Sequence, residues 1–215
     1  MVRSIKIRQV DFIPARMSLL ERNIKRILDC ILSAVALIIF APFIGVCAVA
    51  VKIEDGGPVI FKQERVGLHG KPFNIYKFRT MHVDAEKAGP QLSHSYGNDD
   101  TRLTDVGRFL RRHHIDELPQ LFNIFKGDMA FIGHRPERKC YIDKILEYDS
   151  RYVYLYQMRP GITSHATLYN GYTDTMVKML RRLKYDLFYL GHRSWSWDVK
   201  IFINTFLFLI FGKKF

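Results

Sequence analysis

The amino-acid sequence predicts a mainly α-helical protein with a small β-hairpin, in which a re-entrant membrane helix and interfacial amphipathic helices surround a compact cytoplasmic domain. Three observations indicate this fold class. Residues 30–51 form an uncharged run of 22 residues, which is long enough to enter a bilayer. Two short runs of apolar and aromatic residues, at 59–61 and 73–78, flank a turn bounded by glycines. Leucines at helical spacing recur between residues 176 and 190.

We expect three segments along the chain. Residues 1–52 form an N-terminal amphipathic lead-in and the re-entrant helix, residues 53–192 the cytoplasmic domain, and residues 193–215 a C-terminal interfacial helix. The formal charge of +12 indicates an anionic partner, which is nucleic acid, anionic lipid or a phosphorylated substrate. The membrane segment favours lipid, and no aromatic platform has the spacing of a known nucleic-acid module, so no nucleic-acid partner is expected.

The membrane segment is the first element along the chain. Basic residues lie both before Cys30 and after Val51, so the positive-inside rule keeps both flanks in the cytoplasm. Pro42 lies near the centre, where it removes a helix hydrogen bond and favours a kink. A helix that enters the bilayer, breaks at Ala41–Pro42 and leaves on the same face satisfies both observations. A kinked helix that spans the bilayer remains the alternative.

The hairpin follows the membrane segment. Asp55–Pro58 is a turn, and Val59–Phe61 and Phe73–Phe78 are short strands around Gly67–Gly70. Residues Val83–Asp100 are polar and rich in turn signals, which predicts a loop and a candidate lid.

The most informative run is Asp116-Glu117-Leu118-Pro119-Gln120-Leu121. Proline is tolerated in the first turn of a helix, so a short helix is expected to start at Ile115–Glu117 and to end at Gly127. Asp116 and Glu117 would then lie at the positive end of the helix dipole, which favours ionised carboxylates and attracts phosphate. In the alternative interpretation, both acids are structural, with Asp116 as the N-cap.

Two further turns contain an arginine and a proline. Gly133–Glu137 leads into a helix that ends near Asp149, and a proline at that helix start suggests free backbone N–H groups beside Arg135. Arg159-Pro160-Gly161 is a third turn of this kind.

The last part of the chain predicts two helices. Asp174 is expected to cap a helix that ends at Gly191, with the apolar stripe Met176, Leu180, Leu183, Leu187 and Leu190. Its other faces carry Lys178, Arg181, Arg182 and Lys184, which are solvated by default, with contact to lipid headgroups as the alternative. The tail from Trp195 to Lys214 is too short to span a bilayer, and its tryptophans and lysines suit a helix in the membrane interface.

Together these features indicate a phosphorylated substrate that is handled at a bilayer surface. Arginine forks recognise phosphate, and a magnesium ion held by one or two carboxylates neutralises phosphoryl charge. An ionised aspartate can also attack phosphorus and form an acyl-phosphate.

From about Arg22 to the C-terminus, the chain resembles the bacterial sugar transferases, monotopic phosphoglycosyl transferases that load a sugar-phosphate onto undecaprenyl phosphate. The resemblance rests on ordered motifs: Lys25-Arg26 with Asp29, Pro58–Gly67, Lys77-Phe78-Arg79-Thr80-Met81, Leu110-Arg111-Arg112, Asp116–Leu121, Lys126-Gly127-Asp128-Met129, Arg135-Pro136-Glu137 and Arg159–Thr163. The short N-terminus is similar to the minimal form of that family.

The resemblance implies a reaction in two steps. Asp116 would attack the sugar-bonded phosphate of a UDP-sugar and release UMP, and the phospho-sugar would then pass to undecaprenyl phosphate. This is the first membrane step of a bacterial surface glycan pathway, such as that of an exopolysaccharide or capsule. Mg2+ would lie against Asp116, and Glu117 would position or deprotonate a reactant. The substrate-binding residues that the resemblance implies are Lys77, Arg79, Arg111, Arg135, Pro136, Glu137 and Arg159.

The resemblance also implies a location. The protein would lie on the cytoplasmic face of the bacterial inner membrane as a monotopic protein, with Pro42 at the membrane break. Neither the sugar nor the glycan is identified by the sequence. The oligomeric state is not fixed either, and a homodimer is left open.

The sequence departs from the family's usual pattern at three places. Ala41–Pro42 replaces Ser-Pro, His134-Arg135-Pro136 replaces Pro-Arg-Pro, and Ser164–Thr167 replaces Gly-x-Ala-Gln. The proline and the arginine remain, so the topology and the phosphate contact are expected to be kept, whereas an effect of His134 and of Ser164–Thr167 on specificity is left open.

A non-catalytic scaffold that binds anionic lipid in a glycan assembly complex is the rival hypothesis. It explains the charge and the apolar segments, but it does not require Lys77, Asp116, Glu117 and Arg135 at these spacings.

Overall fold

The computed structural model describes residues 16–85, 100–170, 173 and 175–211. Within them the chain is mainly helical with a small antiparallel hairpin, as predicted. The α-helices are α1 (Leu19–Asp55), α2 (Asp105–Arg112), α3 (Gln120–Lys126), α4 (Lys139–Tyr148), α5 (His165–Asn170), α6 (Met176–His192) and α7 (Trp195–Phe211). The 3-10 helices are η1 (Leu68–Gly70), η2 (Ile115–Glu117) and η3 (Ser150–Gln157). The strands are β1 (Ile60–Val66), β2 (Pro72–Phe78), β3 (Ala130–Ile132) and β4 (Gly161–Thr163).

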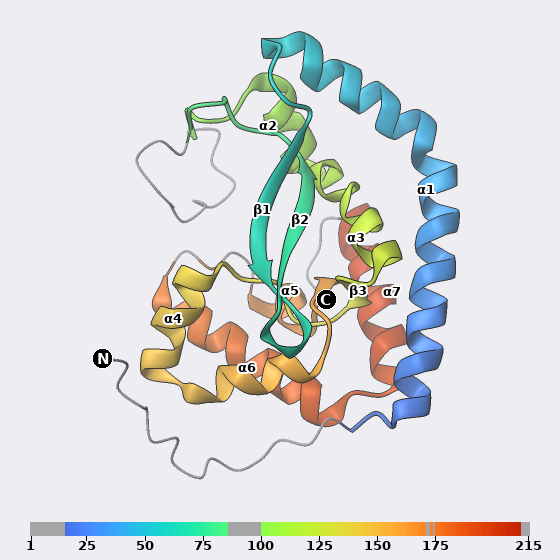
Figure 1. Cartoon of the computed structure of the whole chain (residues 1–215), viewed down its shortest axis with the longest axis vertical. Helices are drawn as coiled ribbons and strands as arrows, with labels where there is room; N and C mark the ends of the chain where they lie inside the picture. The colour runs from blue at the N-terminus through green and yellow to red at the C-terminus, as the bar shows by residue number, and fades with distance from the viewer. Residues whose placement is uncertain (1–15, 86–99, 171–172, 174, 212–215) are drawn as a thin grey trace.

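Helix α1 contains the predicted membrane segment. It begins at a capping box between Ser18 and Glu21, and it ends at Gly56, whose φ of 71° suits glycine. The helix is continuous through Pro42, so the expected break at Ala41–Pro42 is not a gap in the helix. Figure 1 instead shows α1 running along one side of the molecule and bending over toward α2 at its C-terminal end. Its length and composition suffice to cross a bilayer.

Both ends of α1 are bound to the same body of the protein. Near its start, the guanidinium of Arg26 donates to the carbonyls of Ile124 and Phe125 at the end of α3, each at 2.6 Å. At its other end, Glu54 accepts a hydrogen bond from the backbone N–H of Val106 at the start of α2, at 2.9 Å. The face turned away from the body is apolar and exposed; it includes Leu20, Ile24, Ile27, Ile31, Val35, Ile38, Ile39, Val46 and Val49.

The hairpin has the predicted position, but its first strand is longer than expected. β1 and β2 pair in an antiparallel manner, with Phe61 opposite Lys77 and Arg65 opposite Phe73. Ile75 and Phe78 of β2 are buried on opposite faces of the hairpin, since successive side chains of a strand point to opposite sides. Lys77, on the same face as Ile75, is only partly buried.

A parallel pair of three-residue strands was not predicted. β3 pairs with β4, and Ala130 N donates to Pro160 O at 2.8 Å. The expected turn at Arg159-Pro160-Gly161 is therefore wrong, because Gly161 begins a strand. A Cβ atom at Gly161 would lie 2.1 Å from the backbone nitrogen of Gly133, so glycine is needed at position 161 for the two backbone segments to approach closely.

The helices of the C-terminal half build the main core. The predicted stripe on α6 is confirmed, since Leu183, Leu187 and Leu190 are buried against α4, η3 and α7. The N-cap of α6 is Thr175, because its side chain accepts from Lys178 N, whereas Asp174 lies outside the described residues. Arg182 is only 7% exposed, so the default interpretation of a solvated side chain is wrong for this residue.

The remaining expectations are met in part. α4 ends at Tyr148, as expected, but its N-cap is Arg138, so Pro136 precedes the helix and does not start it. α7 spans the expected tail and exposes Val199, Phe202 and Phe206. The lid expected at Val83–Asp100 falls largely on residues 86–99, which lie outside the described part of the chain.

Candidate active site

The two carboxylates of the Asp-Glu pair lie on the 3-10 turn η2, between α2 and α3. His114 precedes the turn with φ 56° and ψ 18°, a left-handed conformation that redirects the chain after α2. The expected single helix from Ile115–Glu117 is instead this turn followed by α3, whose N-cap is Pro119. Asp116 therefore caps neither element, and it is only 6% exposed. The structural interpretation of Asp116 as an N-cap is not supported.

Lys77 of β2 reaches the pair from the hairpin. Its Nζ lies 2.5 Å from Oε1 of Glu117 and 4.0 Å from Oδ2 of Asp116. Arg135 approaches from the other side, with Nη1 3.8 Å from Oε1 of Glu117. The structure thus brings together three segments that are far apart in sequence.

These contacts give the two acids different proton affinities. Burial raises the pKa of Asp116, and the neighbouring charge of Glu117 adds to this, whereas Lys77 opposes it. Burial also disfavours ionised Glu117, but the charges of Lys77 and Arg135 and the hydrogen bond from Lys77 outweigh it and lower the pKa of Glu117 to about 2. Glu117 is therefore fixed as an ionised partner of two cations. Asp116 makes the longer contact of the two acids with Lys77.

Of the other predicted site residues, Arg111 is brought to the pair and Arg79 is not. The charge of Arg111 favours the ionised form of Asp116. The buried guanidinium of Arg79 forms a fork with the carboxylate of the exposed Asp55, and its Nε donates to Pro58 O at 2.7 Å. Arg79 thus joins the end of α1 to β2.

The predicted residues Pro136, Glu137 and Arg159 also have protein partners. Pro136 O accepts from Arg65 Nη1 at 3.1 Å, and Glu137 forms ion pairs with Arg65 and Arg182. Arg159 Nε donates to Gly127 O at 2.9 Å, just beyond the C-terminal end of α3. The structure does not bring Glu137 or Arg159 to the carboxylates.

A small cavity opens beside Glu117. It is lined by Arg65, Ile75, Lys77, Glu117, Gln120, Arg135, Pro136 and Gly161. Gln120 is 2% exposed, and its Nε2 has no hydrogen-bond partner among the described residues. Sequence analysis assigned no role to Gln120 or Arg65, although Gln120 belongs to the run that it singled out.

The residues present fit a magnesium ion that is held mainly by substrate. Among the described residues, no three His, Cys, Asp or Glu side chains form a cluster that could hold a metal. Mg2+ is commonly bound by one or two carboxylates together with phosphate oxygens and water. Asp116 is the carboxylate of the pair that is more weakly engaged by Lys77, so it suits that role.

Two of the departures from the family pattern, at His134 and Ser164, are buried, whereas Ala41, Pro42 and Thr167 are exposed. His134 is fully buried, and neither of its ring nitrogens has a hydrogen-bond partner within the part of the chain that the structure describes. Burial, together with the charge of Arg193, lowers the pKa of His134 to about 3, so its imidazole is neutral at physiological pH. Ser164 caps α5 by accepting from Thr167 N at 3.0 Å. Neither side chain lines the cavity beside Glu117.

Comparison with known proteins gives one family. The model of the family described as bacterial sugar transferase matches residues 20–212. A UDP-N-acetylgalactosamine-undecaprenyl-phosphate N-acetylgalactosaminephosphotransferase of Aeromonas hydrophila is 38% identical over 193 residues, which cover 88% of this chain and 44% of the relative. Two UDP-glucose:undecaprenyl-phosphate glucose-1-phosphate transferases are similar. That of Caulobacter vibrioides is 42% identical, covering 84% of this chain and 67% of the relative. That of Escherichia coli is 38% identical, covering 86% and 40%. The chain thus spans less than half the length of two of these three relatives.

Proposed function

Because this chain belongs to the bacterial sugar transferase family, we propose that it transfers a sugar-1-phosphate from a UDP-sugar to undecaprenyl phosphate. The products would be UMP and an undecaprenyl-diphosphate sugar. The relatives are named for different sugars, so the family fixes the reaction class but not the sugar.

The observation that supports this proposal best is the unequal pair of carboxylates. Glu117 is held by Lys77 and Arg135, whereas Asp116 keeps a 4.0 Å separation from Lys77. An aspartate whose ion pair with its lysine is this long keeps its carboxylate oxygens available and can act as a nucleophile. The flanking cations can bind the phosphate groups of a substrate.

The proposed reaction proceeds in two displacements. A carboxylate oxygen of Asp116 attacks the phosphorus bonded to the sugar, and the bond from that phosphorus to the UMP oxygen breaks, so UMP leaves. A phosphate oxygen of undecaprenyl phosphate then attacks the same phosphorus and releases the carboxylate of Asp116. Lys77, Arg111 and Arg135 hold the phosphate charge throughout, and Glu117 keeps Lys77 and Arg135 in position.

A bound Mg2+ would neutralise charge on the diphosphate, and Asp116 is the residue that would hold it. The nucleophile in the first step is the carboxylate of Asp116 itself.

We further propose that α1 enters and leaves the membrane on the same face. Its two ends are bound to the same body, by Arg26 to α3 and by Glu54 to α2, and its outer face is apolar. A helix that crossed the bilayer would carry these two ends to opposite sides. The site would then lie on the cytoplasmic side of the inner membrane, within reach of the lipid phosphate.

The direct test of function is release of UMP. The purified protein, incubated with Mg2+, undecaprenyl phosphate and each member of a UDP-sugar panel, should release UMP with at least one donor and form a lipid-linked sugar. The scaffold hypothesis predicts lipid binding without UMP from any donor.

The topology can be tested by cysteine labelling in intact cells. In a cysteine-free background, single cysteines at the exposed positions Arg16 and Lys71 flank α1 on either side. We expect a membrane-impermeant maleimide added outside to label neither position, because both flanks are cytoplasmic. Both should be labelled after permeabilisation. Labelling of one position alone in intact cells would mean that α1 spans the bilayer.

A further inference from the structure

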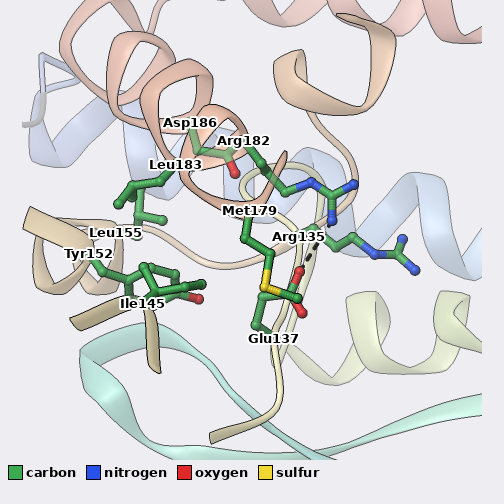
Figure 2. Close-up of a pocket in the computed structure, with 9 residues that line it drawn as sticks. All are labelled: Arg135, Glu137, Ile145, Tyr152, Leu155, Met179, Arg182, Leu183 and Asp186. Atoms are coloured by element: carbon green, nitrogen blue, oxygen red, sulfur yellow. Dashed lines mark hydrogen bonds and ion pairs between the residues drawn. The ribbon is translucent and has the colours of Figure 1, made fainter. Parts of the chain in front are cut away.

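A second small cavity lies behind Arg135, on the side away from the carboxylate pair. Figure 2 shows Glu137 directed toward Arg182 of α6, with Asp186 on the same helix, Tyr152 of η3 on another side of the cavity, and the guanidinium of Arg135 pointing away from it. Arg135 links the two cavities, since it lines both of them. The polar groups of α6 thus lie directly behind a residue of the proposed active site.

The segment that carries Arg135 is clamped from two sides. Arg65 of β1 donates to Pro136 O at 3.1 Å, and its Nη1 lies 3.8 Å from Oε2 of Glu137. On the α6 side, Nη1 of Arg182 lies 3.2 Å from Oε1 of Glu137, as the dashed line in Figure 2 marks. The backbone carbonyl of Glu137 also accepts from Val66 N at 3.3 Å. Glu137 is therefore the point at which the hairpin and α6 meet.

We infer that Arg182 is a positioning residue: together with Arg65 and Glu137 it forms a clamp that holds the segment presenting Arg135 to Glu117 and to the substrate phosphate, and Asp186 weakens this clamp when it competes for Arg182. The inference rests on the proposed function, and it assigns Glu137 to this clamp, which differs from the substrate contact expected from the sequence. A 3.8 Å separation between Arg135 and Glu117 depends on the backbone at residue 135, which the clamp fixes.

The ionisation of Asp186 decides whether a second carboxylate competes with Glu137 for Arg182. Asp186 is 2% exposed, and its Oδ1 has no hydrogen-bond partner among the described residues. Burial raises the pKa of Asp186 to about 8; the charge of Arg182 opposes this and that of Glu137 adds to it. The charged and titratable groups that face it are Arg182 on the same helix, Glu137 and Arg135 on the clamped segment, and Tyr152 on η3.

The direction of the pH effect follows from the protonation state of Asp186. Below pH 8 Asp186 is mostly protonated and neutral, so it does not compete with Glu137 for Arg182. Above pH 8 Asp186 ionises and becomes a second carboxylate for the same guanidinium. Competition for Arg182 would loosen Glu137, and Arg135 with it, so activity should fall at alkaline pH.

The test compares the wild-type protein with Asp186→Asn over pH 6.5–9.5, since asparagine has a similar shape but cannot ionise. The two should have kcat/KM values within about twofold of each other at pH 7, because both side chains are neutral there. At pH 9 only about a tenth of a group with a pKa of 8 remains protonated, so the ratio of variant to wild type should rise toward ~10-fold. Loss of Lys or Arg function at high pH affects both proteins equally and cancels in the ratio.

Arg182 supplies the matched variants. Arg182→Met should lower kcat/KM by ~10–10²-fold at every pH, since the partly buried carboxylate of Glu137 loses one of its two arginine partners and the segment that carries Arg135 loses its contact with α6. Arg182→Lys should restore part of the loss, and Arg182→Met should no longer show the alkaline fall. Thermal unfolding followed by circular dichroism identifies variants that merely fail to fold.

Binding of UDP is measured alongside by calorimetry, at pH 7 and pH 9, because it reports on Arg135 without turnover. A wild type that releases no UMP with any donor would contradict the proposed function, yet weaker UDP binding at pH 9 in wild type alone would still support the clamp. Identical pH profiles of wild type and Asp186→Asn, in both turnover and UDP binding, would overturn the inference.

Discussion

Replacement of Asp116 by asparagine should lower turnover by at least ~10³-fold, the larger of the two main effects that we expect. Asparagine keeps the shape of the side chain but removes the attacking charge and the proposed metal ligand together. The measurement is UMP release in the steady state, with undecaprenyl phosphate present. A variant with more than a tenth of wild-type turnover would exclude Asp116 as the nucleophile.

Glu117→Gln is the matched control for Asp116→Asn. It removes the other carboxylate of the pair, whose pKa of about 2 makes it a fixed anion that holds Lys77 and Arg135. We expect an overall loss of roughly 10²–10⁴-fold and a milder effect on the first half-reaction, because Glu117 positions the cations and does not itself attack phosphorus. Equal losses in the first half-reaction for the two variants would remove the distinction between the acids.

Replacement of Lys77 by methionine should lower kcat/KM by about 10²–10³-fold, as loss of a preorganised cation at a phosphoryl site commonly does. Lys77 is the nearest cation to Glu117 and also faces Asp116, so its loss removes charge from the site and leaves Glu117 buried with weaker compensation. The pKa of Glu117 should then rise from its low value.

Lys77→Arg keeps the charge on a longer, planar group and serves as the control. It should retain more activity than Lys77→Met but less than wild type, because the 2.5 Å contact with Glu117 is specific to the ammonium. Initial rates over a range of UDP-sugar concentrations separate binding from turnover. Activity of Lys77→Met within about threefold of wild type would contradict the role that we give to Lys77.

The sequence predicted the elements whose patterns are local. The hairpin follows from strand-forming runs around glycines, and α6 follows from leucines at spacings of three and four. The placement of Asp116 and Glu117 just before a helix followed from Pro119, although the residues at that start form a 3-10 turn. Each of these predictions needed only residues close together in the chain.

The parts that the sequence did not predict depend on distant partners. β3 and β4 are each three residues long, which is too short to show an alternating apolar and polar pattern in the sequence. Only their pairing with each other makes them strands. An arginine in a motif has the same chemistry whether it binds a substrate phosphate or an internal carboxylate, so Arg79 could not be separated from Arg135. The pattern on α6 assigned its polar positions to solvent, which hid the buried Arg182.

The central claim is that Asp116 carries the phospho-sugar between the two substrates, and mass spectrometry of the protein tests it most directly. The protein is mixed briefly with Mg2+ and an active UDP-sugar, without lipid acceptor, then quenched and digested. We expect the mass of a phospho-sugar on the peptide that contains Asp116 in the wild-type protein, together with one equivalent of UMP, and no adduct in Asp116→Asn. A wild-type protein that turns over without ever carrying this adduct, and whose kinetics require both substrates bound together, would contradict the covalent mechanism.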